Sequence, residues 1–165
     1  MKTLFRSFTV LAAATAFAAQ PAMAQNSSDM PVSASVLNNC TITAAPMLFG
    51  AITDFSAADT DSTSTIALLC TPNAAYEVQL NDGQNDDGGQ RRLSNLAGTE
   101  FINYEIYSDT SRTSRWGDNI GSDTVTGTAS VIGTSTLTAY GRIAQGEPAV
   151  SAGVYTDLIT VTVNF

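Results

Sequence analysis

The chain has 165 residues, and 15 acidic residues against seven basic ones give it a formal net charge of −8 at pH 7. This balance excludes nucleic acid and anionic lipid as expected partners, because both carry negative charge. The sequence contains no histidine, so no imidazole base is present for nucleophilic catalysis. Its only two cysteines make a poor ligand set for zinc.

The first 24 residues have the features of an export signal. Two basic residues precede an apolar stretch at residues 8–19, which is too short to span a bilayer. Residues 22–24, Ala-Met-Ala, fit a signal-peptidase site. We therefore expect residues 1–24 to be removed, leaving 141 residues with five arginines, no lysine and a charge of −10. This length fits one domain, which we expect at residues 38–165.

A short amphipathic strand pattern follows the predicted cleavage site, within residues 25–37. Met30, Val32, Ala34 and Val36 occupy alternate positions and share one face. The pattern alone fits two arrangements equally: a strand donated to another molecule, or an ordinary first strand of a self-contained sandwich. In either arrangement the proline at position 31 lacks an N–H group and removes one hydrogen bond from the ladder.

The two cysteines, Cys40 and Cys70, remain in a chain that we expect to be exported. Oxidising compartments convert such a pair into a disulfide far more often than into a metal site. The sequence therefore predicts a Cys40–Cys70 bridge, which closes a loop of roughly thirty residues and contributes ~3–4 kcal/mol on the chain-entropy model.

The rest of the chain alternates apolar and polar residues and is rich in Thr, Ser, Val, Ala and Gly, which indicates an all-β fold. Short strands separated by Gly, Asp, Asn and Pro clusters are typical of a sandwich. Within the 101–107 run, Ile102, Tyr104 and Ile106 form the better core face. The expected strands are residues 63–70, 75–80, 101–107, 126–132, 136–143 and 156–165.

No residue pattern predicts an enzyme, a cofactor or a metal. The acidic loop at residues 81–90 lacks the ligand register of a calcium loop, so we expect a solvated hairpin turn there. Adjacent solvated acids such as Asp86 and Asp87 rarely perform acid-base catalysis. We expect Arg91 and Arg92 to be solvated beside this turn, and Trp116 to be a packing residue rather than a sugar-stacking platform.

The last predicted strand is the clearest one. Ile159, Val161, Val163 and Phe165 lie on one face of it, and no further strand follows in the sequence. An immunoglobulin-like sandwich normally ends with a strand that pairs with the penultimate one and covers the core. We therefore expect an incomplete immunoglobulin-like sandwich with an open groove beside this strand, and unpaired edges of this kind can receive a strand from another molecule.

A set of short motifs extends along the chain from residue 32 to residue 165. In their order and spacing they make the chain resemble the spore coat protein U domain family, whose members include the pilins of archaic chaperone-usher pili. The motifs are Val32-Ser33-Ala34-Ser35-Val36, Cys40-Thr41-Ile42, Phe49-Gly50, Cys70, Tyr76-Glu77-Val78, Asp82-Gly83, Arg92-Leu93, Asn103-Tyr104-Glu105-Ile106-Tyr107, Trp116-Gly117, Tyr140-Gly141-Arg142-Ile143, Gly153-Val154-Tyr155-Thr156-Asp157 and Val161-Thr162-Val163-Asn164-Phe165.

The resemblance implies a structural subunit of a surface pilus. Such a subunit would be held by a periplasmic chaperone docked beside the final strand, residues 155–165, and passed to an outer-membrane usher. The segment at residues 30–36 would then replace the chaperone strand in an identical or related pilin. The implied location is the cell surface, reached through the periplasm, with adhesion or biofilm formation as the downstream role.

Two other functions fit the same sequence. One is a secreted module that binds carbohydrate or a surface, such as a tip adhesin or a monomer complemented by its own strand. The other is a structural component of a spore or cyst coat, for which strand exchange could serve equally well. Chaperone dependence and the pairing of residues 30–36 separate these alternatives.

Overall fold

The structure is a computed structural model and describes residues 23–165. The chain forms two compact units, with the boundary between Ser35 and Val36. The predicted signal peptide lies almost wholly outside the described residues. All ten strands belong to the part from Val36 onward, and they confirm the predicted all-β fold. Within the described range no helix is long and apolar enough to cross a membrane.

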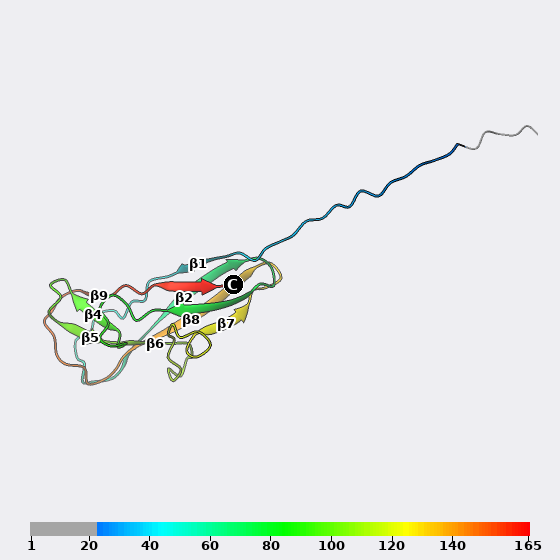
Figure 1. Ribbon diagram of the computed structural model, residues 1–165. Coiled ribbons are helices and arrows are strands. Elements are labelled where there is room, and N and C mark those ends of the chain that lie inside the picture. Colours follow the sequence, from blue (N-terminus) through cyan, green and yellow to red (C-terminus); the bar gives the residue numbers. More distant parts are fainter. Residues whose placement is uncertain (1–22) are drawn as a thin grey trace, which may run out of the picture. The chain divides into compact units, whose positions relative to one another are not determined.

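The largest sheet has four antiparallel strands in the order β1-β2-β8-β6 (Figure 1). Its two long central strands, β2 and β8, pair along ten positions, from Thr60 opposite Ile143 to Leu69 opposite Thr134. β1 lies at one edge of this sheet because it pairs with β2 alone. The strands span Cys40–Ala44 (β1), Thr60–Cys70 (β2), Thr134–Ile143 (β8) and Glu105–Tyr107 (β6).

Two smaller antiparallel sheets complete the domain, in the orders β10-β3-β7 and β5-β4-β9. In the first of them β10 pairs with β3 only and is therefore an edge strand. The strands span Val161–Asn164 (β10), Ala75–Leu80 (β3), Val125–Thr128 (β7), Phe101–Asn103 (β5), Arg92–Asn95 (β4) and Tyr155–Thr156 (β9).

The core lies between the sheets and follows the period-two pattern of the sequence. In β2 the buried residues are alternate ones, as are those of β3, because successive side chains of a strand point to opposite faces. Trp116 is buried among them and donates from Nε1 to the carbonyl of Val78 at 2.9 Å, which confirms its packing role. The predicted disulfide is present and joins the opposed residues Cys40 and Cys70 of β1 and β2.

Three local predictions were wrong. The run at 101–107 is interrupted at Tyr104, where the chain crosses from the sheet of β5 to the sheet of β6, although Ile102, Tyr104 and Ile106 are buried as expected. The run at 156–165 likewise divides into β9 and β10. The loop at 81–90 does not close a hairpin, because β3 and β4 belong to different sheets.

Candidate functional site

The candidate site is the space between the unpaired edges of β1 and β10. These two strands contact each other, yet they belong to different sheets and no backbone ladder joins them within the described residues. β1 begins with Cys40 at the end of the domain that carries the disulfide, and β10 ends near this same end. The two strands are therefore roughly antiparallel (Figure 1). Each edge strand therefore presents a free row of backbone donors and acceptors to the other.

Half-buried apolar side chains lie along these two edges. Ile159, Val161 and Val163 pack against the core, while Thr160 and Thr162 between them are exposed, as the alternation predicts. On the opposite side Ile42 of β1 packs against the same core. None of these four side chains is fully buried, so a further strand would complete their burial.

Phe165 differs from the other residues of the predicted face. It follows β10 and its side chain is 54% exposed, so it is not part of the half-buried row. A residue at a strand end has fewer neighbours on either side, which leaves its side chain uncovered.

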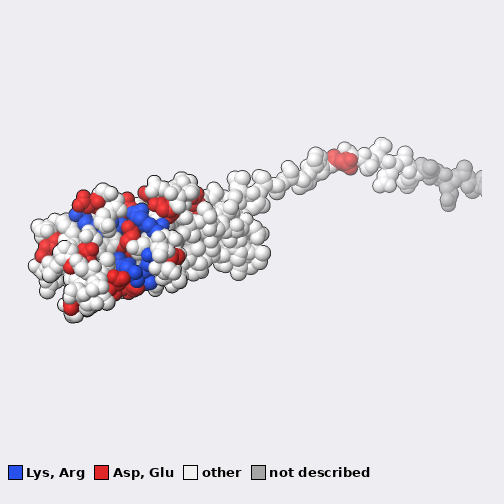
Figure 2. All heavy atoms as spheres, turned by 90° about the horizontal axis from the view of Figure 1, so that it is seen from below, with Lys and Arg blue, Asp and Glu red and all other residues white. Residues whose placement is uncertain are grey.

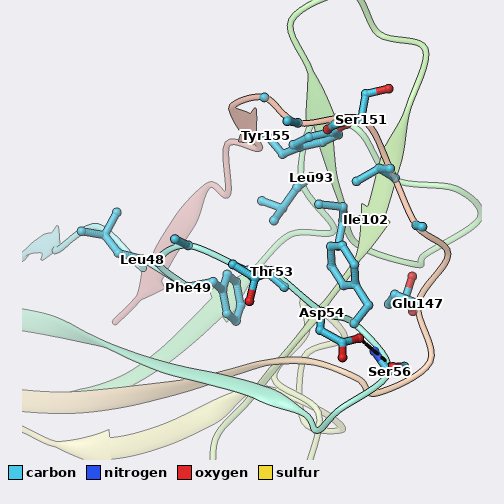
Figure 3. A pocket seen from close by; sticks show the side chains of 18 of the residues that line it. Leu48, Phe49, Thr53, Asp54, Ser56, Leu93, Ile102, Glu147, Ser151 and Tyr155 are labelled. Atoms are coloured by element: carbon cyan, nitrogen blue, oxygen red, sulfur yellow. Dashed lines mark hydrogen bonds between the residues drawn. The ribbon is translucent and has the colours of Figure 1, made fainter.

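A hollow of about 990 Å³ lies at the β9 end of the domain (Figure 3). Its walls are residues 47–56, which follow β1, and residues 149–155, which lead into β9. Leu93 and Ile102 form part of an apolar lining, and Asp54, Glu147 and Ser151 supply polar groups. This hollow could not be predicted from the sequence, because residues 47–56 show no strand or helix period.

Asp157 anchors the segment between β9 and β10. Its Oδ2 accepts a 2.7 Å hydrogen bond from the hydroxyl of Tyr104, and its Oδ1 accepts from the backbone N–H groups of Gln84 and Asn85 at 2.9 and 3.2 Å. Burial and the neighbouring Asp157 carboxylate raise the pKa of Tyr104, so its hydroxyl stays a donor. These contacts fix one wall of the groove to the core and to the acidic loop.

Residues 23–35 form the N-terminal segment, which is a unit separate from the domain. It contains no regular secondary structure, and β1, the first strand of the sandwich, begins only at Cys40. Met30, Val32 and Val36 have 83%, 88% and 85% of their surfaces exposed, and Ala34 is exposed as well. The alternating apolar face predicted from the sequence is therefore exposed to solvent along this segment.

A family model for the spore coat protein U domain matches residues 26–162. The chain belongs to the spore coat protein U domain family. No curated protein sequence matches it. It is also similar to a chain in the crystal structure of the CsuC–CsuE chaperone–tip adhesion subunit pre-assembly complex from archaic chaperone-usher Csu pili of Acinetobacter baumannii, with 26% identity and a TM-score of 0.56. This match covers 79% of the chain and 40% of that one.

Several motif residues of this spore coat protein U domain meet around Arg91, whose position the sequence analysis predicted wrongly. Its side chain is fully buried rather than solvated. The guanidinium donates to the carbonyl oxygens of Leu80 and Trp116 at 2.8 Å each, and to Asn81, and it pairs with Glu105. The buried charge is therefore fully compensated by hydrogen bonds, as such groups must be.

A second arginine extends this polar network of the domain. Arg115 pairs with Glu105 at 2.9 Å and with Asp123 at 3.3 Å, and also with Asp82. Together Arg91 and Arg115 tie the loop after β3 to the segment around Trp116. Since β3 is the strand on which β10 pairs, the network supports the β10 edge of the groove. Among residues 23–165 no cluster of metal-ligating side chains occurs, and these acidic groups are paired with arginines.

Proposed function

We propose that this spore coat protein U domain chain is a structural subunit of an archaic chaperone-usher pilus. It assembles by inserting residues 30–36 between β1 and β10 of a neighbouring identical or related subunit. The observation that carries the proposal is the combination of two unpaired sheet edges, β1 and β10, that carry half-buried apolar side chains with an N-terminal segment whose alternating apolar residues are exposed. Each element supplies what the other lacks.

Apolar burial and backbone hydrogen bonds would drive such an exchange. Burying Met30, Val32 and Val36 would contribute ~1.5–3 kcal/mol for each of these side chains. Backbone hydrogen bonds to both edges would add about 1 kcal/mol each, less the one that the proline at position 31 cannot make. These terms oppose an ordering cost of ~1–2 kcal/mol per residue. The chain has no lysine after residue 2, so Lys–Asn isopeptide links cannot help, and strand exchange must hold the polymer non-covalently.

The proposal includes a route to the surface. The signal at residues 1–24 directs the chain to the periplasm, where the cysteine pair oxidises. A periplasmic chaperone fills the groove beside Ile159, Val161, Val163 and Phe165 until an outer-membrane usher exchanges it for the next subunit. The chaperone–subunit pre-assembly complex in the similar Csu structure supports this step. The role of the fibre is adhesion or biofilm formation, and no catalytic activity is assigned to it.

The experiment compares alternate positions of the donor segment. The double variant V32D/V36D places charges on the face that would enter the groove, whereas S33D/S35D places the same charges on the other face. Both variants should still form a soluble complex with the chaperone, because the acceptor groove is unchanged. Pili should be lost for V32D/V36D and retained for S33D/S35D. Equal assembly by both variants would show that another segment is the donor.

The binding-module alternative makes the opposite prediction for the isolated chain. A self-contained module would fold as a soluble monomer without the chaperone, with residues 30–36 paired in its own sheet. A pilus subunit expressed without its chaperone should aggregate or be degraded. Co-expression with and without the chaperone therefore separates the two functions.

A further inference from the structure

One end of the sandwich carries no charged side chain. Four long stretches of sequence lack Asp, Glu, Lys and Arg altogether, and they contain β1, β7, β8 up to Gly141, most of β2 and β10. All five arginines of the domain and its acidic residues lie elsewhere, as Figure 2 shows for one face. The charge-free stretches are residues 37–53, 62–76, 124–141 and 158–165. Residues 47–53 and Leu158 reach the β9 end, so the charge-free end is the one where β1 begins, β10 ends and the β7–β8 turn lies.

Exposed apolar residues gather at this charge-free end. Val131 and Ile132 form the tip of the turn between β7 and β8, with 78% and 73% of their surfaces exposed. Hydrogen bonds join this turn to the turn after Cys70, from Cys70 N to the Gly133 carbonyl at 2.7 Å and from Asn73 N to Ser130 at 3.3 Å. An apolar tip of this kind, free of charge, is typical of an interaction surface.

The chain leaves the domain from the same end. Thr71 holds the exit, because its Oγ1 donates to the Leu37 carbonyl at 3.1 Å and accepts from the Asn39 N–H at 3.1 Å. The side chain of Leu37 is exposed beside this anchor. From Val36 to Cys40 the chain can span at most about 14 Å. A neighbour that accepts Val36 must therefore lie close to the charge-free end.

The direction of the donated strand determines which end of the neighbour lies against the charge-free end. The closing strand of an immunoglobulin-like sandwich runs antiparallel to the strand before it, which is β10 here. β10 runs toward the charge-free end, since Val161 is opposite Leu80 and Asn164 is opposite Glu77 at the beginning of β3. An antiparallel donor therefore has its last residues at the opposite end of the acceptor, where β4, β5 and β9 lie (Figure 1).

That opposite end also exposes apolar residues. Leu96, in the turn between β4 and β5, is fully exposed, and Leu158 is 59% exposed. Both line a shallow hollow of about 420 Å³. We infer that the charge-free end of each subunit, formed by Leu37, Val131 and Ile132, packs against the Leu96 and Leu158 end of the subunit that receives its N-terminal strand. This inference rests on the proposed function.

The charge distribution supports such a head-to-tail contact between copies of one chain. Each mature subunit carries a net charge of −10, so copies repel one another at most orientations. The Leu96 and Leu158 end carries Asp157 and Glu100, and the charge-free end adds no negative charge to it. Apolar packing can therefore contribute there without a like-charge penalty.

A photoreactive phenylalanine at position 132 tests the contact in assembled fibres, with position 120 as the matched control. Ile120 is also exposed, at 67%, but lies in the loop before β7. We expect cross-linked dimers from position 132, with the partner peptide at residues 94–98 or 154–158, and none from position 120. Fibres that form normally but cross-link no better from 132 than from 120 would overturn the inference and leave strand exchange intact. Failure of the unmodified chain to form fibres would overturn both proposals.

Charge substitutions give an independent readout. Fibres of Ile132→Asp should form through the unchanged donor strand but should dissociate at least ten-fold faster in urea than fibres of Ile120→Asp. Both positions are exposed, so neither variant should lose folding or chaperone binding. Equal dissociation rates for the two variants would contradict a packed junction at this end.

Discussion

The hydroxyl of Tyr104 donates to Oδ2 of Asp157 at 2.7 Å and so connects the strand crossing in the core to the wall of the groove. Tyr104 lies where the chain passes from one sheet to another, and Asp157 lies between β9 and β10. Because β10 is an edge strand with one neighbour, its position depends on such anchors more than that of an inner strand. The stability of the groove should therefore be sensitive to this pair.

Tyr104→Phe removes this hydrogen bond and leaves the core packing of the ring. We expect the free energy of unfolding to fall by about 1–3 kcal/mol, since the acceptor is a partly buried carboxylate. The measurement is urea unfolding of the subunit complemented with a peptide of residues 25–37, followed by the fluorescence of Trp116. Tyr107→Phe is the control, because no hydrogen bond of the Tyr107 hydroxyl to the described residues is present. Equal stability of both variants would show that the Asp157 contact is not an anchor.

Gly83 is required where the acidic loop approaches Asp157. Its φ is +89°, and a Cβ added there would collide with the Asp157 carboxylate. Gly83→Ala should cost about 2–5 kcal/mol, combining left-handed strain with overpacking. Gly88→Ala is matched, because its φ is +63° and nothing lies within 4 Å of the added Cβ, so only about 1–2 kcal/mol of strain is expected. Urea midpoints of the peptide-complemented variants measure the difference, and an equal loss in both would argue against a tight contact at Gly83.

Arg91→Met should destabilise the domain strongly. The substitution leaves the carbonyl oxygens of Leu80, Asn81 and Trp116 without their buried donor, and Glu105 loses one of its two arginines. We expect a loss of about 3–5 kcal/mol and a low periplasmic yield of the chaperone complex. Arg92→Met removes a partly exposed pair with Asp87, hydrogen bonds to the Asn85 and Asp86 carbonyls and the contact with the Phe101 ring, and should cost only about 1–2 kcal/mol because these groups reach solvent. Similar yields for both variants would contradict a structural role for the buried guanidinium.

Glu100 makes the groove wall sensitive to acid. Hydrogen bonds from Ser151, Tyr155 and Asn95 hold the pKa of Glu100 below its ordinary value of 4.5. A carboxyl whose pKa is lowered by folding stabilises the folded state above its unfolded pKa, and this contribution is lost as the pH falls through the lower folded value. Glu100→Gln should therefore weaken the loss of stability between about pH 5 and pH 3. Ser151→Ala should change the pH dependence of the urea midpoint in the same direction by a smaller amount. If the urea midpoints of both variants follow the wild-type pH dependence, Glu100 is not the source of the acid sensitivity.

The sequence predicted the long strands better than the short ones. β2, β3 and β8 alternate over six or more residues, so their period is visible without a structure. β1 and β4 have only five and four residues, too few to establish a period, and they were missed as strands. Their formation depends on tertiary pairing with β2 and β5, which the local sequence does not encode.

The candidate site could be predicted in part for the same reason. The alternation of Ile159, Val161 and Val163 indicated one wall of the groove, because burial of one face leaves a period of two. The buried position of Arg91 could not be inferred, since its acceptors are carbonyl oxygens from separate loops that only the fold brings together. The hollow beside residues 47–56 has no sequence signal either, because an irregular segment lines it.

The most direct test of the account is the effect of a peptide of residues 25–37 on the isolated mature subunit lacking its own N-terminal segment. If the subunit accepts this strand, its thermal unfolding midpoint should rise with peptide concentration, because a ligand that binds only the folded state stabilises it by mass action. A peptide with aspartate in place of Val32 and Val36 should leave the midpoint unchanged. A subunit that is equally stable with either peptide, or with none, would contradict strand donation into the groove between β1 and β10.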